Sequence, residues 1–183
     1  MKLKLIIRLS YILFAFMIFG CTQDDPTEPT EENTLLSTSF ENNGRFSADG
    51  WTLPDLSDSS NDVPSSGGIF SLELEASQPP EVYAQIKVPV KTQFSNFKLS
   101  FWAKSTAVTS NIYGKAILSL VRNGSVIQSA SISVDDIIWK DYSIQDTFTV
   151  ATGDSFMVQL SGGIAQLLSG RTYFDLCTLY GIE

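Results

Sequence analysis

Histidine is absent from the 183-residue sequence, and cysteine occurs only twice. Without histidine, the chain has no imidazole for a Ser-His-Asp triad, for a histidine-ligated zinc site or for a histidine proton shuttle. Two cysteines do not make a disulfide scaffold. These absences disfavour the commonest hydrolytic and zinc-dependent enzyme classes, so we predict a protein that is not an enzyme and has no catalytic cofactor.

Positive charge is also scarce, because 12 Lys and Arg stand against 20 Asp and Glu, for a net charge of −8. A nucleic-acid partner is excluded, since phosphates require clustered Lys and Arg side chains. The apolar content of 43% is sufficient for a packed core. The chain is therefore predicted to be folded and not to bind nucleic acid.

Residues 1–20 differ from the rest of the chain. Lys2, Lys4 and Arg8 precede an apolar run from Leu9 to Phe19. A membrane-spanning helix needs about 20 apolar residues, and this run has roughly half that number. The segment is typical of a secretory signal peptide.

The signal peptide is followed by a cysteine in a characteristic setting. Residues 18–21 read IFGC, with a small residue directly before Cys21. This pattern resembles the lipobox of bacterial lipoproteins, in which the cysteine is acylated and becomes the new N-terminus. Phe19 is bulkier than the residue usual at that position. The alternatives are an ordinary signal peptide or an uncleaved anchor.

Residues 21–33 are predicted to form a lipidated, acidic, disordered tether. Residues 22–33 read TQDDPTEPTEEN, with five acidic residues, two prolines and no large apolar side chain. Such a segment does not bury enough apolar surface to offset the entropy of ordering. It resembles the surface-export signals of some Gram-negative lipoproteins, which implies lipid anchoring in the outer membrane at the cell surface. A spacer on a periplasm-facing lipoprotein is the alternative.

Residues 34–183 are predicted to be one all-β domain. Apolar and polar residues alternate with period two in most of this region, which is typical of half-buried strands. Asn123-Gly124 between two such runs predicts a type I′ hairpin. About eight or nine short strands favour a two-sheet jelly-roll β-sandwich, with a closed barrel as the alternative. Leu53 to Gly68 lacks the alternation and is expected to be a long loop, either functional or mobile.

Several short segments of this domain occur in an order that resembles a known family. They are Ser39-Phe40-Glu41, Gly50-Trp51, Phe101 to Ser105, Trp139 to Ser143, Tyr173 to Asp175, and Leu179 to Ile182. The order is similar to that in galactose-binding-like jelly rolls, especially carbohydrate-binding modules of the CenC type. The resemblance implies non-catalytic binding of a poly- or oligosaccharide.

The same resemblance implies a structural calcium site. In the family, an acidic residue that closes the first strand and one in the last strand share a cation, and Glu41 and Asp175 hold those positions. The family commonly has a second acidic residue where this chain has Leu176. The alternative is that both carboxylates are ordinary surface or hydrogen-bonded groups.

Sugar recognition requires flat aromatic faces beside hydrogen-bonding side chains. Trp102 alternates with the apolar residues of its strand and is expected to point away from the core. Tyr83 does the same, beside Gln85. Further candidate polar contacts are Arg122 and Gln128, which flank the predicted hairpin. The alternative for Trp102 is that a loop or lysine stems cover it.

Two features of the domain bear on an enzymatic function. Glu73 and Glu75 lie about 7 Å apart on one face of a predicted strand, which matches a glycosidase spacing through the strand period alone. Cys177 lacks a histidine partner and is expected to be a packed residue. The alternative to glycan binding is a structural or assembly lipoprotein that uses the same sandwich to bind an envelope protein partner.

Overall fold

The computed structural model describes residues 33–106, 113–165 and 170–182. The predicted signal peptide, Cys21 and the predicted tether as far as residue 32 lie outside the described residues. The described part of the chain is built from strands without a helix, so no membrane-spanning helix occurs within it.

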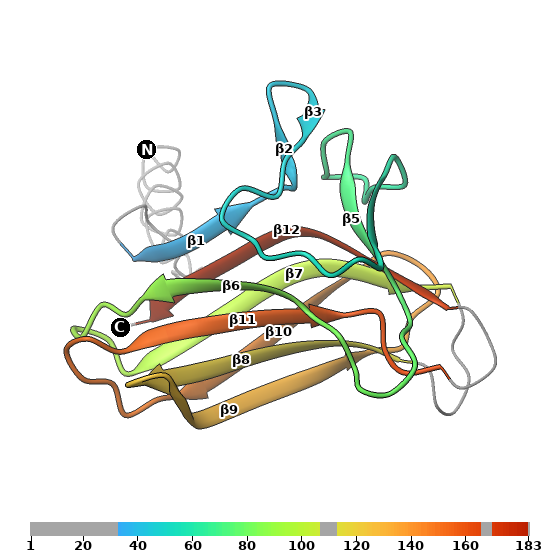
Figure 1. Cartoon of the computed structure of the whole chain (residues 1–183). Coiled ribbons are helices and arrows are strands. Elements are labelled where there is room, and N and C mark those ends of the chain that lie inside the picture. The colour runs from blue at the N-terminus through green and yellow to red at the C-terminus, as the bar shows by residue number, and fades with distance from the viewer. Residues whose placement is uncertain (1–32, 107–112, 166–169, 183) are drawn as a thin grey trace, which may run out of the picture.

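The strands form two antiparallel sheets and a small hairpin of β2 and β3 (Figure 1). Their bounds are β1 Thr34–Thr38, β2 Glu41–Asn42, β3 Arg45–Phe46, β4 Ser57–Ser60, β5 Ser71–Glu75, β6 Ala84–Pro89, β7 Asn96–Ser105, β8 Gly114–Arg122, β9 Ser125–Val134, β10 Lys140–Thr147, β11 Ser155–Ser161 and β12 Arg171–Ile182.

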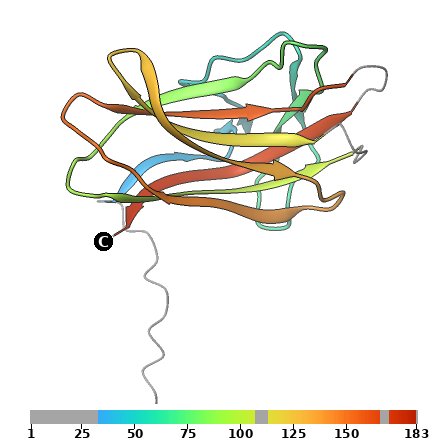
Figure 2. The same cartoon turned by 90° about the horizontal axis from the view of Figure 1, so that it is seen from below.

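One sheet has four strands in the order β6-β11-β8-β9, which lie one below the other in Figure 1. The other has six strands in the order β10-β7-β12-β5-β4, with β1 also paired to β12. Figure 2 shows β1 in blue running beside β12 in red. The predicted two-sheet jelly-roll sandwich is confirmed.

The core fills the space between the two sheets, and the alternation in the sequence explains why. On β7, Phe97, Leu99 and Phe101 are fully buried, whereas the residues between them are partly exposed. Phe97 meets Phe156 of the other sheet at a centroid distance of 4.6 Å in an edge-to-face contact. The inward faces of the two sheets therefore interlock through aromatic rings.

The predicted hairpin is confirmed. Asn123 and Gly124 join β8 to β9 with φ angles of 51° and 80°. Two consecutive positive φ angles define a type I′ turn, whose twist matches that of the strands it joins.

A bulge in β12 was not predicted, and it positions a candidate site residue. The pairing of β12 with β7 shifts register between Asp175 and Thr178, and Leu176 has a φ of 50°. Before the shift Phe174 faces the core, and after it Cys177 does. β5 pairs with residues 171–174 and β1 with residues 177–180, so Asp175 lies where these two neighbours of β12 meet.

The prediction of one long loop from Leu53 to Gly68 is partly wrong. It contains strand β4, which pairs with β5 along residues Ser57–Ser60. After β4, Asp62 accepts hydrogen bonds from Lys104 Nζ and from Trp139 Nε1, the latter at 3.0 Å. This part of the segment therefore packs on the outer face of the six-stranded sheet.

Candidate functional site

Polar side chains gather on the outer face of the four-stranded sheet. Gln85 on β6 pairs with Gln159 on β11, and Gln159 pairs with Ile117 on β8. Cross-strand partners place their side chains on the same face, about 5 Å apart. Two amide groups and one apolar side chain therefore form a row across three strands.

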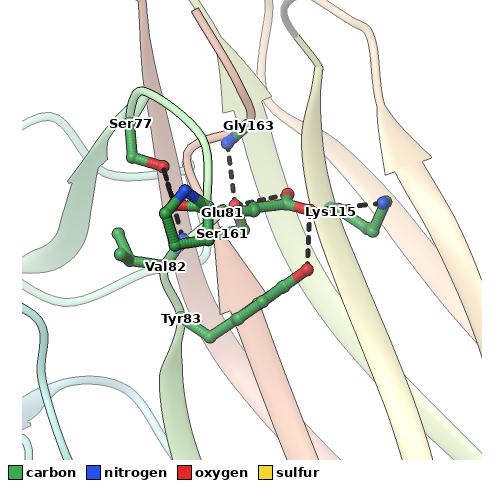
Figure 3. Close-up of polar contacts among 8 residues, drawn as sticks. Ser77, Glu81, Val82, Tyr83, Lys115, Ser161 and Gly163 are labelled. Atoms are coloured by element: carbon green, nitrogen blue, oxygen red, sulfur yellow. Dashed lines mark hydrogen bonds and ion pairs between the residues drawn. The ribbon is translucent and has the colours of Figure 1, made fainter.

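In the next row along the same strands, Ser161 on β11 pairs with Lys115 on β8, and the carboxylate of Glu81 binds both side chains. Figure 3 shows the contacts of this carboxylate. Tyr83 Oη donates a hydrogen bond of 2.6 Å to Glu81 Oε2, and Ser161 Oγ donates one of 2.7 Å to Glu81 Oε1. Lys115 Nζ forms an ion pair with Glu81 Oε2 at 3.5 Å. Side chains from β8, β11 and the segment before β6 thus converge on one acid.

The two charged side chains of this cluster differ in their exposure to solvent. The Glu81 side chain is 11% exposed, whereas the Lys115 side chain is 38% exposed. Burial, the hydrogen bond to Glu81 and the charge of that carboxylate all raise the pKa of Tyr83 above its ordinary value. The phenol therefore stays protonated, and its bond to Glu81 fixes the direction of a half-buried ring.

The backbone around the cluster is held by its own hydrogen bonds. Ser77 Oγ accepts a hydrogen bond of 3.3 Å from Val82 N, and Ser161 Oγ accepts one of 2.9 Å from Gly163 N. Gly163 has a φ of 93°, and a Cβ there would overlap the carbonyl of Tyr113. Only glycine lets the end of β11 approach β8 this closely.

The arrangement offers an oriented aromatic ring, two amides, an ammonium group and a carboxylate on one face of the sheet. These groups donate and accept hydrogen bonds at fixed positions beside a flat apolar surface. Such a combination recognises an uncharged polyhydroxylated ligand by stacking and hydrogen bonding.

Of the predicted ligand residues, Tyr83 and Gln85 lie together on this face. Trp102 lies on β7 in the other sheet, with Asp141 and Asp175 as cross-strand partners. It points away from the core as predicted and is half-buried. The structure therefore separates Trp102 from Tyr83, on opposite faces of the sandwich.

Arg122 and Gln128 are engaged in contacts within the fold. Arg122 donates hydrogen bonds of 2.8 and 2.7 Å to the two carboxylate oxygens of Asp154, and one of 3.1 Å to Thr149 O. Gln128 Nε2 donates to Thr147 O at 2.7 Å. Both residues sit at the β8–β9 hairpin, at the opposite end of β8 from Lys115.

The pair of Arg122 and Asp154 leads to a prediction about stability. Asp154 is 4% exposed, and the hydrogen bond from Arg122 holds the pKa of its carboxyl below the usual 3.8. The ionised Asp154 carboxylate, paired with Arg122, therefore contributes its full stabilisation of the fold above pH 3.8. This contribution is lost as the pH falls through the lower pKa that Asp154 has in the folded protein. Arg122→Ala should lower the melting temperature strongly at pH 7, because it leaves a buried carboxylate unpaired.

Thermal unfolding of both proteins at pH 7 and at pH 2 to 3 checks this. The difference in melting temperature should shrink at acid pH, and a difference independent of pH would contradict the pairing. Lys98→Ala on β7 is the control for removing a positive charge.

Glu41 and Asp175 are brought together, although the sequence places them far apart. Glu41 Oε2 accepts hydrogen bonds from Ile69 N at 2.6 Å and Phe70 N at 3.3 Å. A Cβ on Gly67 would lie 2.5 Å from Asp175 Oδ2, and one on Gly68 would overlap the Glu41 carboxylate. The two glycines therefore run directly across both carboxylates.

Asp175 carries an unusual buried charge. The residue is fully buried, and Oδ2 accepts no hydrogen bond from the described residues, while Oδ1 accepts one of 2.7 Å from Leu176 N. Burial and, to a smaller extent, the charge of Glu41 raise the pKa of Asp175 to about 6. An orphaned carboxylate oxygen beside a second carboxylate fits a cation. Among the described residues no third His, Cys, Asp or Glu joins them, so backbone carbonyls or hydroxyls would complete the ligand set.

The remaining candidates have structural partners. Glu73 and Glu75 both pair with Arg171, at 2.9 and 3.2 Å, on the six-stranded sheet. Cys177 is fully buried, as predicted, and burial raises the pKa of its thiol. Trp51, from the family-like segment Gly50-Trp51, is buried against Phe40 at a centroid distance of 5.4 Å.

Sequence reasoning missed Glu81, Gln159, Lys115 and Ser161. The signal for Gln159 was present, because it alternates with the buried residues of β11. Glu81 lies before β6, where no periodic pattern marks the direction of a side chain. Its role follows only from the packing of β8 and β11 beside it.

No protein-family model matches the chain, and no curated protein matches it. Solved structures do. The carbohydrate-binding module TmCBM61, solved in complex with β-1,4-galactotriose, is 18% identical, with a TM-score of 0.54 over 82% of this chain and 99% of that chain. The CBM22-1 xylan-binding domain from Paenibacillus barcinonensis Xyn10C is 20% identical, with a TM-score of 0.58 over 82% and 96%.

An enzyme also contains this fold. The MgGH51 α-L-arabinofuranosidase, solved with bound arabinose, is 18% identical, with a TM-score of 0.54 over 81% of this chain but only 26% of the enzyme chain. At these identities the likeness shows a shared fold. The chain therefore has the jelly-roll fold of carbohydrate-binding modules, as the sequence predicted.

Proposed function

We propose that the domain binds a poly- or oligosaccharide without catalysis, on the outer face of its four-stranded sheet. The observation that carries the proposal is the cluster in which Tyr83 and Lys115 are fixed by Glu81 beside Gln85 and Gln159. This site lies on a fold shared with carbohydrate-binding modules, two of which are described as galactotriose-bound and xylan-binding.

Each group has a defined part in the proposed mechanism. The ring of Tyr83 stacks on the C–H surface of a pyranose, and its orientation is fixed before the ligand arrives, so little rotamer entropy is lost. The amides of Gln85 and Gln159 donate to and accept from sugar hydroxyls. In the neighbouring row, Lys115 supplies a donor and Glu81 supplies an acceptor.

A binding role suits the carboxylates better than glycoside hydrolysis does. Hydrolysis needs two carboxyl groups on either side of the scissile bond, about 5 to 9.5 Å apart. Glu81 is bound to three side chains, and Glu73 and Glu75 pair with Arg171 on the other sheet. The separation of these acids onto two sheets supports a non-catalytic module.

Calcium is proposed as a structural cofactor at Glu41 and Asp175. Support comes from the buried Oδ2 of Asp175, which lacks a hydrogen-bond donor among the described residues, and from the glycine pair that leaves room for both carboxylates. When bound, the cation would neutralise two adjacent negative charges where β1, β5 and β12 meet. Its position on the six-stranded sheet gives it no contact with the proposed sugar.

Affinity electrophoresis in gels that contain soluble polysaccharides tests the function. β-1,4-Galactan and xylan are the first probes, because the related folds bind β-1,4-linked galactotriose and xylan. A panel of β-glucans, mannans and α-glucans follows. Retardation by at least one polysaccharide is expected, and unchanged mobility with the whole panel would overturn the proposal.

The proposed setting is the cell envelope. A lipid on Cys21 would anchor the chain in the outer membrane and hold the domain at the surface, facing glycans outside the cell. Protease treatment of intact cells should then degrade the domain. Full protection until the outer membrane is opened would instead indicate the periplasm-facing orientation.

One observation favours the alternative, an assembly lipoprotein with an envelope protein partner. Ile137 and Ile138, in the connection between β9 and β10, are 68% and 70% exposed. Adjacent exposed isoleucines are typical of a protein contact. Loss of a copurifying envelope protein from an Ile137→Ser/Ile138→Ser variant, together with no polysaccharide binding by the wild type, would put this alternative ahead.

A further inference from the structure

The two edges of the four-stranded sheet differ. The edge strand β6 carries Lys87 and Pro89, and Gln85 exchanges backbone hydrogen bonds with Thr52 on its free side. Charge, proline and a covering segment are ordinary ways of keeping a sheet edge from pairing with another chain. The edge at β6 is therefore protected.

The opposite edge, β9, has little of this protection. It lies at the bottom of the sheet in Figure 1 and is ten residues long, Ser125–Val134. No charged residue occurs from Asn123 to Val134, and none of these residues is proline. A register shift at its start is the one irregularity that the ladder with β8 shows.

The edges of the six-stranded sheet resemble β6 rather than β9. β10 carries charges at Lys140, Asp141 and Asp146, β4 is only four residues long and contains Asp58, and β1 is only five residues long. Within the described residues, β9 is thus the long, uncharged edge strand. Val126 and Ile127 on it are also 52% and 48% exposed.

The charges that flank β9 have opposite signs. Arg122, whose guanidinium is paired with Asp154, precedes the strand with a side chain that is 39% exposed, and the exposed Asp135 follows it. Two antiparallel copies of β9 would place the Arg122 end of each beside the Asp135 end of the other. The strand is therefore neutral along its length, and the antiparallel arrangement keeps the two copies of Asp135 at opposite ends of the pair.

We propose that two copies of this chain pair antiparallel along β9, about a two-fold axis near Ser129. The backbone groups of both edges would then be hydrogen-bonded, and the two four-stranded sheets would become one continuous eight-stranded sheet. An axis perpendicular to the sheet keeps the outer face of each copy on the same side.

This geometry has a consequence that rests on the proposed function. Both clusters around Tyr83 would face the same direction, one at each end of the continuous sheet. A polysaccharide with repeating units could engage both, and the second contact would be intramolecular. Weak single sites would then give tight binding to a polymer.

Sedimentation velocity of the full chain in a mild detergent tests the pairing directly. The wild type should sediment as a dimer at micromolar concentration. Ser129→Lys places like charges opposite each other at the axis and should weaken dimerisation at least tenfold. Ser143→Lys, a change at another exposed serine, on the edge strand β10, should leave the dimer intact.

Site-directed cross-linking gives a second readout. Ser129→Cys should form a disulfide-linked dimer on mild oxidation, whereas Ser143→Cys should not. Cys177 is buried, and Cys21 is common to both variants, so neither explains a difference. A wild type that stays monomeric at 100 µM, or equal cross-linking of both variants, would overturn the proposal, as would a β9 edge occupied by a bound peptide.

The tests of dimerisation and of glycan binding are separable. Tyr83→Ala should leave the dimer unchanged, because Tyr83 lies by the opposite edge of the sheet. Ser129→Lys should reduce retention on a polysaccharide at least tenfold while its affinity for a trisaccharide stays within twofold. Equal losses for polymer and trisaccharide would contradict the bivalent arrangement, without bearing on the glycan site itself.

Discussion

Tyr83→Ala is expected to lower affinity for the bound polysaccharide at least tenfold, to below detection in affinity electrophoresis. Tenfold corresponds to about 1.4 kcal/mol, a modest loss for the removal of a stacking ring. The ring is half-buried and its hydroxyl is bound to Glu81, so the free protein already holds it in place. Isothermal titration calorimetry with an oligosaccharide of the same polymer measures the change.

Two variants separate the ring from its hydroxyl and from the rest of the surface. Tyr83→Phe keeps the stacking face but leaves Glu81 with one donor fewer, so an intermediate loss is expected. Trp102→Ala removes a half-buried aromatic residue from the other sheet and should leave affinity within twofold of the wild type. A large loss with Trp102→Ala and none with Tyr83→Ala would move the site to the six-stranded sheet.

Calcium is expected to raise the melting temperature, and a chelator to reverse the rise. A cation at a hundred times its dissociation constant contributes about 2.7 kcal/mol to stability. For a domain of this size, that corresponds to an increase in melting temperature of roughly 5 to 10 °C. Differential scanning calorimetry with calcium and with chelator measures it.

Asp175→Asn should abolish this calcium response. In chelator the variant should be at least as stable as the wild type, because it removes a buried charge that faces Glu41. In the presence of calcium, the wild type should be more stable than the Asp175→Asn variant. Asp141→Asn, an exposed change on β10, is the matched control and should keep the full response. A wild type indifferent to calcium and to chelator would refute the site.

The fold could be predicted because most of its strands bury one face. In β7 and β11 the buried residues alternate without interruption, so a period of two is visible in the sequence. β4 was missed because Ser57–Ser60 consists of polar residues and pairs at the sheet edge by backbone bonds alone. The bulge at Asp175 was missed because it depends on how β1 and β5 share β12.

The candidate site was less predictable than the fold. The alternation of apolar and polar residues correctly predicted that Trp102 and Tyr83 point away from the core. It does not predict which of the two sheets a strand joins. Arg122 was proposed as a ligand contact because it flanks a hairpin, and its partner Asp154 is 32 residues away in sequence. Glu41 and Asp175 were predicted as cation ligands only through the resemblance to carbohydrate-binding modules. Their proximity depends on the bulge in β12 and on the path of Gly67 and Gly68 across both carboxylates.

The proposed function requires that sugar binds on the outer face of the four-stranded sheet. Its most direct test is a titration of the isotope-labelled protein with the oligosaccharide, followed by the NMR signals of side-chain amides and indoles. The NMR signals of the Gln85 and Gln159 side-chain amides should shift until the site is saturated, while the signal of the Trp102 indole should stay unchanged. Shifts at Trp102 with unchanged Gln85 and Gln159 would contradict the proposed function.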